Sequence, residues 1–442
     1  MGAGHGHGHL HPPPASRRVR RVVAAVIVPM LVATVVMLVT LWPREPTPTD
    51  PSGANDRRLG TVTALQVREC APDEVVETPS GVTVSRCGSV TVRLTEGTEA
   101  GRTVQTEVPS GPGSPRADVG DDVVVLALTD PADPSSRRYA ISDHQRGVPL
   151  AWLAVLVAVA VIGFGRLRGA AALAGLAVTF AVLLLFVLPA IVAGQSPLLV
   201  AVVGSATIMF VVLYLTHGVS VRTSVAVLGT LASLVLTGAM AALAMDLTHL
   251  TGYGSEDAST LGIYYQDVDL HGLLLAGIII GSLGVLDDIT VTQAETVAEL
   301  AAANPAMSRR QLYRAATRVG RAHIASVVNT IVLAYAGASL PVLVLLLGSG
   351  RGIEETLNSE FIAQEIVRSL VGTLGLVAAV PLTTALAALV TAGRARRPAA
   401  EAAGEPTPRP RPADTDPPAA VVVVDPALLT NPWEEPPPTG RR

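Results

Sequence analysis

The chain has 442 residues, of which 49% are hydrophobic and only 15% are charged, and its mean hydropathy is +0.47. Soluble globular chains carry about 25% charged residues and lack repeated apolar runs of ~20 residues, so this composition excludes a large soluble enzyme. The net charge is -4 and the chain contains no lysine, so overall charge gives no reason to expect a nucleic-acid partner. We therefore predict an α-helical polytopic membrane protein with at most one small water-soluble domain.

Residues 1–21 are predicted to form a disordered cytoplasmic tail rich in His, Pro and Arg. The alternation of His and Gly between Gly4 and His11 either holds a transition metal weakly or is an incidental, tag-like tract. Four arginines then precede an apolar run over residues 22–42, which is long enough to cross a bilayer. We interpret this run as an uncleaved transmembrane anchor whose basic end lies in the cytoplasm.

Residues 57–143 are predicted to form an extracytoplasmic β-rich domain, folded as a small β-barrel or sandwich. Its expected strands are the β-branched runs Thr61–Val67, Val82–Cys87, Val90–Thr95, Thr103–Val108 and Val123–Leu128. Cys70 and Cys87 fall in this domain and are expected to form a disulfide in an oxidising compartment, although two buried free thiols are the alternative. No catalytic or metal-ligand spacing occurs here, so we expect a binding or sealing role.

Residues 149–391 are predicted to form a seven-helix transmembrane domain, which with the anchor makes about eight spans. The apolar runs are Pro149–Phe164, Ala170–Val192, Leu198–Thr216, Thr223–Met245, Leu270–Leu286, Ile324–Leu347 and Val367–Leu389. Counted from a cytoplasmic N-terminus, the inner loops are basic and the outer loops are mainly acidic, as the positive-inside rule requires. The Pro-rich residues 394–442 are then expected to form a disordered cytoplasmic tail.

An acidic pair, Asp287 and Asp288, lies near the inner end of one apolar run. Ionisable residues at membrane depth are costly and tend to face a cavity or a partner, which indicates an ion or proton site. The alternative is that one of the two aspartates caps a helix start at the interface. Gly277, Gly281 and Gly284 fall on one side of the same helix and are expected to permit close helix packing.

A cytoplasmic helical hairpin is predicted over residues 288–322, because Asn304-Pro305 interrupts the helix and Ser308 with Gln311 has the spacing of a capping box. An acidic helix face precedes this break and a basic face follows it. Folding the hairpin brings the two faces together and predicts three ion pairs, Glu299–Arg310, Glu295–Arg314 and Asp288–Arg321.

The segments Gly281–Thr290, Arg318–Arg321 and Asn329–Gly337 resemble the YibE/F-like family of bacterial multi-pass membrane proteins. The order of elements is also similar, with one anchor, a β-rich external domain and a block of about seven spans. The resemblance covers roughly residues 61–389. It implies a predicted transporter of the bacterial inner membrane, with no established substrate.

The expected function is a secondary transporter or permease of unknown substrate. Asp287 and Asp288 are the candidate ion or proton acceptors, and Asn329, with Thr330 and Tyr335 on the same predicted span, is their candidate orienting partner. The alternative is a non-transporting scaffold or sensor whose external domain binds a partner. We expect no catalytic residue, no cofactor and no metal site. The expected partners are the lipid bilayer and a small solute or ion, and a homo-oligomer or protein partner stays open.

Overall fold

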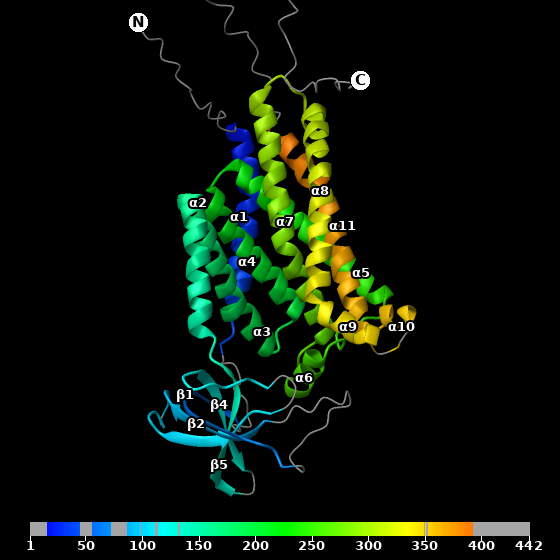
Figure 1. Ribbon diagram of the computed structural model, residues 1–442. Helices are drawn as coiled ribbons and strands as arrows, with labels where there is room; N and C mark the ends of the chain where they lie inside the picture. Colours follow the sequence, from blue (N-terminus) through cyan, green and yellow to red (C-terminus); the bar gives the residue numbers. More distant parts are fainter. Residues whose placement is uncertain are drawn as a thin grey trace, which may run out of the picture. The chain divides into compact units, whose positions relative to one another are not determined.

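The computed structural model describes residues 16–44, 55–71, 86–97, 99–110, 114–130, 133–348, 350 and 352–391, and Figure 1 shows its elements. The His-rich tract, the Pro-rich tail and most of the predicted strand Val82–Cys87 lie outside the described residues. Along the chain, a five-stranded sheet stands between helices α1 (Arg17–Thr40) and α2 (Gly147–Val182), and long apolar helices follow.

The sheet has the strand order β3-β2-β1-β4-β5, and each neighbouring pair is antiparallel. Its strands are β1 (Asn55–Arg68), β2 (Cys87–Leu94), β3 (Thr103–Glu107), β4 (Asp122–Asp130) and β5 (Asp133–His144). Alternate side chains of β2 point into the core of the sheet, where Val90, Val92 and Leu94 are all buried. The sequence did not predict β5, since its polar run lacks apolar alternation.

The prediction of a barrel or sandwich was wrong, because the described strands form one small open sheet. The edge strands β3 and β5 approach each other where the Thr106 hydroxyl donates to the Tyr139 carbonyl over 2.6 Å. Closing a barrel requires a backbone ladder between the edge strands, and none joins β3 to β5 among the described residues. The sheet is therefore curled but not closed.

The predicted disulfide between Cys70 and Cys87 is confirmed, with the two Cα atoms 5.1 Å apart. The pairing of β1 with β2 brings the cysteines together, because Cys87 lies opposite Arg68, two residues before Cys70. The disulfide therefore links the end of β1 to the start of β2.

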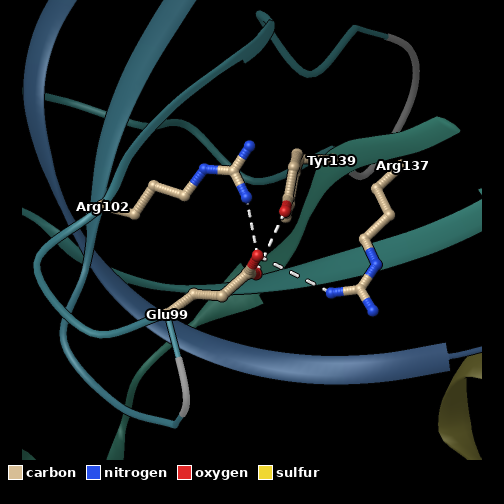
Figure 2. A network of polar contacts seen from close by, with 4 residues as sticks. All are labelled: Glu99, Arg102, Arg137 and Tyr139. Atoms are coloured by element: carbon tan, nitrogen blue, oxygen red, sulfur yellow. Dashed lines mark hydrogen bonds and ion pairs between the residues drawn. The ribbon is translucent and has the colours of Figure 1, made fainter. Parts of the chain in front are cut away.

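A network of charged side chains around Glu99 joins the β2–β3 connection to β5 (Figure 2). The Glu99 carboxylate accepts hydrogen bonds from Arg102 over 2.6 Å and from the Tyr139 hydroxyl over 3.1 Å, and Arg137 lies 3.7 Å away. Partial desolvation raises the pKa of Glu99, but these hydrogen bonds and the two guanidinium charges outweigh it and leave the pKa below its ordinary value. The carboxylate is thus stabilised in its charged form.

Seven helices are long and apolar enough to cross a membrane in the part of the chain that the structure describes. The longest continuous element, Gly147–Val192, joins α2, the π-helical turn η2 (Leu183–Val187) and α3 (Leu188–Val192). The remaining helices are α4 (Pro197–His217), α5 (Val221–Leu247), α6 (Glu256–Tyr264), α7 (Leu270–Ala303), α8 (Arg309–Ala338), α9 (Leu340–Gly348), α10 (Ile353–Leu357) and α11 (Glu360–Thr391).

The count of seven is one fewer than the sequence predicts, and the difference lies in Gly147–Val192. At 1.5 Å per residue this element would be roughly 70 Å long if straight, more than twice the ~30 Å of a hydrocarbon core. It is not straight, because Arg166 has a φ of 51°, outside the helical region. Gly169 lies so close to the Val161 carbonyl that a side chain there would collide with it. The two predicted spans are therefore two legs of one element, joined by a tight bend.

Helices α4, α5, α7 and α11 form the buried interior of the helical part, whereas α1 and α8 are largely exposed. Helices α5, α7 and α11 pack against one another in all three combinations, and α8 lies against α7 and α11 (Figure 1). The predicted span Ile324–Leu347 is divided between α8 and α9. Because α5, α7 and α11 meet in the centre, a polar side chain on any of their shared faces is withdrawn from lipid and water.

Replacing Glu99 with Gln is expected to loosen the sheet at neutral pH but not at low pH. A carboxylate whose pKa is depressed in the fold contributes stability above its unfolded pKa, about 4.3, and this contribution is lost as the pH falls through the folded value. Hydrogen-exchange mass spectrometry of the β2 and β5 peptides in the full chain should show faster exchange in Glu99→Gln at pH 7. As the pH is lowered toward 3, the difference between the variant and the wild type should shrink.

Glu96→Gln is the matched control, because Glu96 is exposed and its carboxylate has no partner among the described residues. This variant should exchange like the wild type at both pH values. Faster exchange in Glu99→Gln that persisted unchanged at pH 3 would mean that charge plays no part in the network.

Candidate functional site

A group of buried hydroxyl and amide side chains lies where α5, α7 and α11 meet, and we call it the polar seam. Each of its members has 0% of its surface exposed, and they are Thr230, Ser233, Thr237, Thr290, Gln293, Thr383 and Thr384. The members on α5 and α7 recur at steps of three or four residues, and α11 contributes the adjacent pair Thr383 and Thr384, so the seam forms when the three helices pack their shared faces together. It is the most extensive buried polar feature among the described residues.

Two hydrogen bonds cross the polar seam between helices. The Thr384 hydroxyl of α11 donates to the Gln293 side-chain oxygen of α7 over 3.0 Å. The hydroxyls of Thr230 on α5 and Thr290 on α7 lie 2.6 Å apart. Interhelical bonds of this kind fix the register of membrane helices, so α7 is tied to both of its neighbours.

The pair Thr230 and Thr290 has more acceptors than protons. Thr230 also lies 3.0 Å from the Ala226 carbonyl, and Thr290 lies 3.0 Å from the Asp287 carbonyl. Each hydroxyl carries one proton, so only two of these three hydrogen bonds form at once. The pair therefore has alternative arrangements, and reorienting one hydroxyl changes the donor presented to the other.

Several polar atoms in and beside the seam have no hydrogen-bond partner among the described residues. Within the seam they are the Gln293 Nε2, Thr383 Oγ1 and Ser233 Oγ atoms. Elsewhere on α7 and α8 they include Asp287 Oδ1 and His323 Nε2. Each buried polar group left in this way costs about 1–3 kcal/mol. Such a group fits a place where a solute, an ion or water is bound.

Glycines allow the helices around the seam to approach closely. A side-chain carbon on Gly229 or Gly375 would collide with Thr383 or Thr237 respectively. On Gly320 of α8, it would stand 2.6 Å from Val380 Cγ1 and 2.8 Å from Gln293 Nε2. Of the predicted packing glycines, only Gly281 has a close neighbour among the described residues. A side-chain carbon added there would lie 3.5 Å from the Tyr335 hydroxyl, whereas one added at Gly277 or Gly284 would meet nothing within 4 Å.

The two predicted acids, Asp287 and Asp288, differ in burial and surroundings. Asp287 is half-buried and lies one turn before Thr290, so it adjoins the polar seam. Asp288 is exposed, and its Oδ2 atom lies 3.9 Å from His323 Nε2 on α8. Asn329 and Thr330 are also exposed, and the Thr330 hydroxyl bonds to the Ser326 carbonyl of its own helix. Of the predicted site residues, Asp287 and Tyr335 are thus the partly buried ones, and Tyr335 packs against the core of the helices.

The three predicted ion pairs of the hairpin are corrected by the structure. Glu299 pairs with Arg222 of α5 over 3.5 Å, and Asp288 lies near His323 rather than Arg321. Helix α8 buries Leu312, Ala316 and Gly320 and leaves its arginines exposed, including Arg310, Arg314 and Arg321. Burying apolar and small residues avoids the desolvation of charges, and this outweighs the attraction between two charged faces. The predicted capping box of Ser308 and Gln311 is confirmed.

A cavity of about 330 Å³ lies beside the polar seam, and its walls come from helices α2, α5 and α7 and from the end of α4 with the turn that follows it. It is lined by Arg168, His217, Ser220, Arg222, Thr223, Ala226, Val291, Ala294 and Glu295. It adjoins the seam because Ala226 accepts from Thr230 and Val291 follows Thr290. The sequence predicts that Arg168, the turn 217–222 and Glu295 all lie on one side of the membrane, and the cavity brings them together.

No group of three His, Cys, Asp or Glu side chains that could hold a metal ion occurs in the described ranges. The N-terminal His tract lies outside them. The polar groups that converge here are hydroxyls, an amide, one half-buried carboxylate and guanidinium groups. Such groups can donate and accept hydrogen bonds and can pair with ions.

The long apolar helices and the buried polar seam define a polytopic α-helical membrane protein with a small β-sheet domain. The sequence profile of the YibE/F-like protein family matches residues 153–393, which is more than half of the chain, and the chain belongs to this family. No curated protein and no solved structure matches it. The match begins after the sheet and contains every residue of the polar seam.

The close contact at Gly320 generates a stability prediction. Gly320→Ala adds a methyl group against Val380 and Gln293, and such overpacking destabilises by about 1–3 kcal/mol. Unfolding in mixed detergent micelles, followed by circular dichroism, should show this loss. Gly337→Ala is the control on the same helix, because a methyl group there meets nothing within 4 Å. Equal stability of the two variants would contradict the close packing of α8 on the seam.

Proposed function

We propose that this protein is a secondary transporter or permease that moves a small polar solute or ion along the polar seam. The observation that carries the proposal is the set of unpaired polar atoms in the seam, above all Gln293 Nε2 and Thr383 Oγ1. These groups are buried between apolar helices, where an unpaired polar atom is costly. A passing solute or bound water would pair with them and relieve that cost.

A non-transporting scaffold or sensor is the rival function. Polar side chains also join membrane helices in proteins that transport nothing, and the bond between Thr384 and Gln293 would serve that purpose equally well. A scaffold, however, gains nothing from unpaired atoms next to those bonds. The hydroxyls of Thr230 and Thr290 can reorient, which also favours a transport route rather than a rigid scaffold.

In the proposed mechanism Asp287 is the ion or proton acceptor. Its Oδ1 atom is buried without a hydrogen-bond partner among the described residues, and it lies one helical turn from Thr290 of the seam, whose hydroxyl donates to the Asp287 backbone carbonyl. Asp288 is exposed, and its carboxylate lies 3.9 Å from His323 Nε2 without a hydrogen bond between them, so Asp288 is not assigned to ion binding. Binding a cation or proton at Asp287 removes a charge from the helix interface and favours closer packing there.

The proposed location is the bacterial inner membrane, with both termini in the cytoplasm. The basic residues of the cavity, Arg168 and Arg222, support this orientation through the positive-inside rule. The sheet would then be extracytoplasmic, where the disulfide of Cys70 and Cys87 is stable. The proposed role is not enzymatic.

Flux measurements test the proposal. Proteoliposomes of the wild type and of Asp287→Asn are compared with empty liposomes for uptake of a mixture of ions and metabolites, detected by mass spectrometry. The wild type should accumulate at least one solute above the empty liposomes, and Asp287→Asn should lose most of that uptake. The Asn side chain keeps the shape of Asp but cannot take up a charge-compensating proton or cation.

The matched control is Asp246→Asn, because Asp246 is an exposed aspartate near the end of α5 and far along the helix from the seam. This variant should transport like the wild type. Identical fluxes in wild-type, Asp287→Asn and empty liposomes would support the scaffold function instead.

A further inference from the structure

The cavity beside the seam has a distinctive set of charged groups. Arg168 and Arg222 bring two permanent positive charges, and His217 adds an imidazole. The guanidinium of Arg168 makes no hydrogen bond or ion pair with any other described residue. Arg222 shares its charge with Glu299, whose side chain is 72% exposed and therefore screened by solvent. Positive charge in this cavity is thus only weakly compensated by the protein itself.

The start of α5 adds further donors to the same wall. Ser220 caps this 27-residue helix, and its hydroxyl accepts from the Thr223 backbone N–H over 3.1 Å. The remaining N–H groups of the first turn lack intrahelical partners, and the helix dipole places partial positive charge there. Ser220 and Thr223 also line the cavity, and their hydroxyls lie 2.9 Å apart and bond to each other. Two guanidinium groups and a helix N-terminus around one cavity form a site for an oxyanion.

One acidic residue, Glu295, lines this otherwise basic cavity. Among the described residues its carboxylate has no salt-bridge or hydrogen-bond partner. A carboxylate only accepts hydrogen bonds, so it repels a fully deprotonated anion such as sulfate. The hydroxyl of a phosphate that still carries a proton donates a hydrogen bond to the carboxylate, while its other oxygens accept from the guanidinium groups. The combination therefore selects a protonated oxyanion.

We infer that this cavity is a binding site for hydrogen phosphate or a small protonated phosphomonoester, with Arg168 and Arg222 holding the phosphate oxygens and Glu295 accepting a hydrogen bond from the phosphate hydroxyl. A volume of about 330 Å³ is at the lower end of small-molecule sites and accommodates a phosphate with a small organic group. The idea that a transported solute enters through this cavity rests on the proposed function. Binding of phosphate in the cavity does not depend on transport, so the test measures binding alone.

The test is isothermal titration calorimetry of the full chain in phosphatidylcholine nanodiscs, with inorganic phosphate and sulfate as separate titrants. Phosphate should bind the wild type, and sulfate should bind at least roughly tenfold more weakly, since a charged acceptor is worth about one such factor. Arg168→Gln should weaken phosphate binding roughly tenfold or more. Glu295→Gln should remove most of the preference for phosphate, because the amide can donate to sulfate.

Arg318→Gln is the control, since Arg318 is an exposed arginine of α8 that does not line the cavity. It should bind phosphate like the wild type. Failure of the wild type to bind phosphate, or equal binding by Arg168→Gln, would overturn the site. Equal affinity of the wild type for both anions would overturn the role of Glu295.

A second experiment distinguishes free phosphate from a lipid headgroup as the ligand, because both offer phosphate oxygens to arginine. The titration is repeated in nanodiscs that contain phosphatidylglycerol, whose phosphodiester has no proton for Glu295. Phosphate affinity should stay the same in these nanodiscs. A marked loss would show that the lipid competes for the cavity and would overturn the assignment of a protonated ligand.

Discussion

A glutamine side chain buried among apolar membrane helices constrains the packing of the whole helical part. Gln293 has 0% of its surface exposed, and it contacts α11 through Thr384 and lies against Gly320 of α8. A primary amide withdrawn from water costs several kcal/mol unless its oxygen and nitrogen find partners. Helix α11 therefore has to present Thr384 at this level, and α8 has to present a glycine. One polar residue thus fixes the rotation of two neighbouring helices.

The same constraint explains why α7 and α8 do not pair through their charges. Once Gly320 must face Gln293, the residues one and two turns earlier, Ala316 and Leu312, face inward as well. The arginines of α8 are then left on the exposed face, where ion pairs contribute little. Asp288 finds His323 and Glu299 finds Arg222, because these are the basic groups that remain close after the helices have packed.

The sequence predicted those features that follow from composition and local pattern. The apolar runs, the capping box of Ser308 and the pairing of Cys70 with Cys87 belong to this class. It did not predict the open sheet, because closure depends on whether two edge strands far apart in the chain can pair. It also missed the polar seam, although Thr290 and Gln293 at a spacing of three in an apolar helix were a visible signal. Which face of a membrane helix is buried depends on its neighbours, and one sequence does not contain that information directly.

The proposed function requires that water or a solute can enter the polar seam, although its side chains are buried, and that the apolar core beside it stays dry. Thr290 and Ile289 are adjacent on α7 and both buried, but Thr290 belongs to the seam and Ile289 to the apolar core. The described cysteines are both in the disulfide, so a single introduced cysteine can be followed by mass spectrometry after treatment with a small thiol reagent. In proteoliposomes, Thr290→Cys should react many times faster than Ile289→Cys. Equal and negligible reaction at both positions would contradict a hydrated seam.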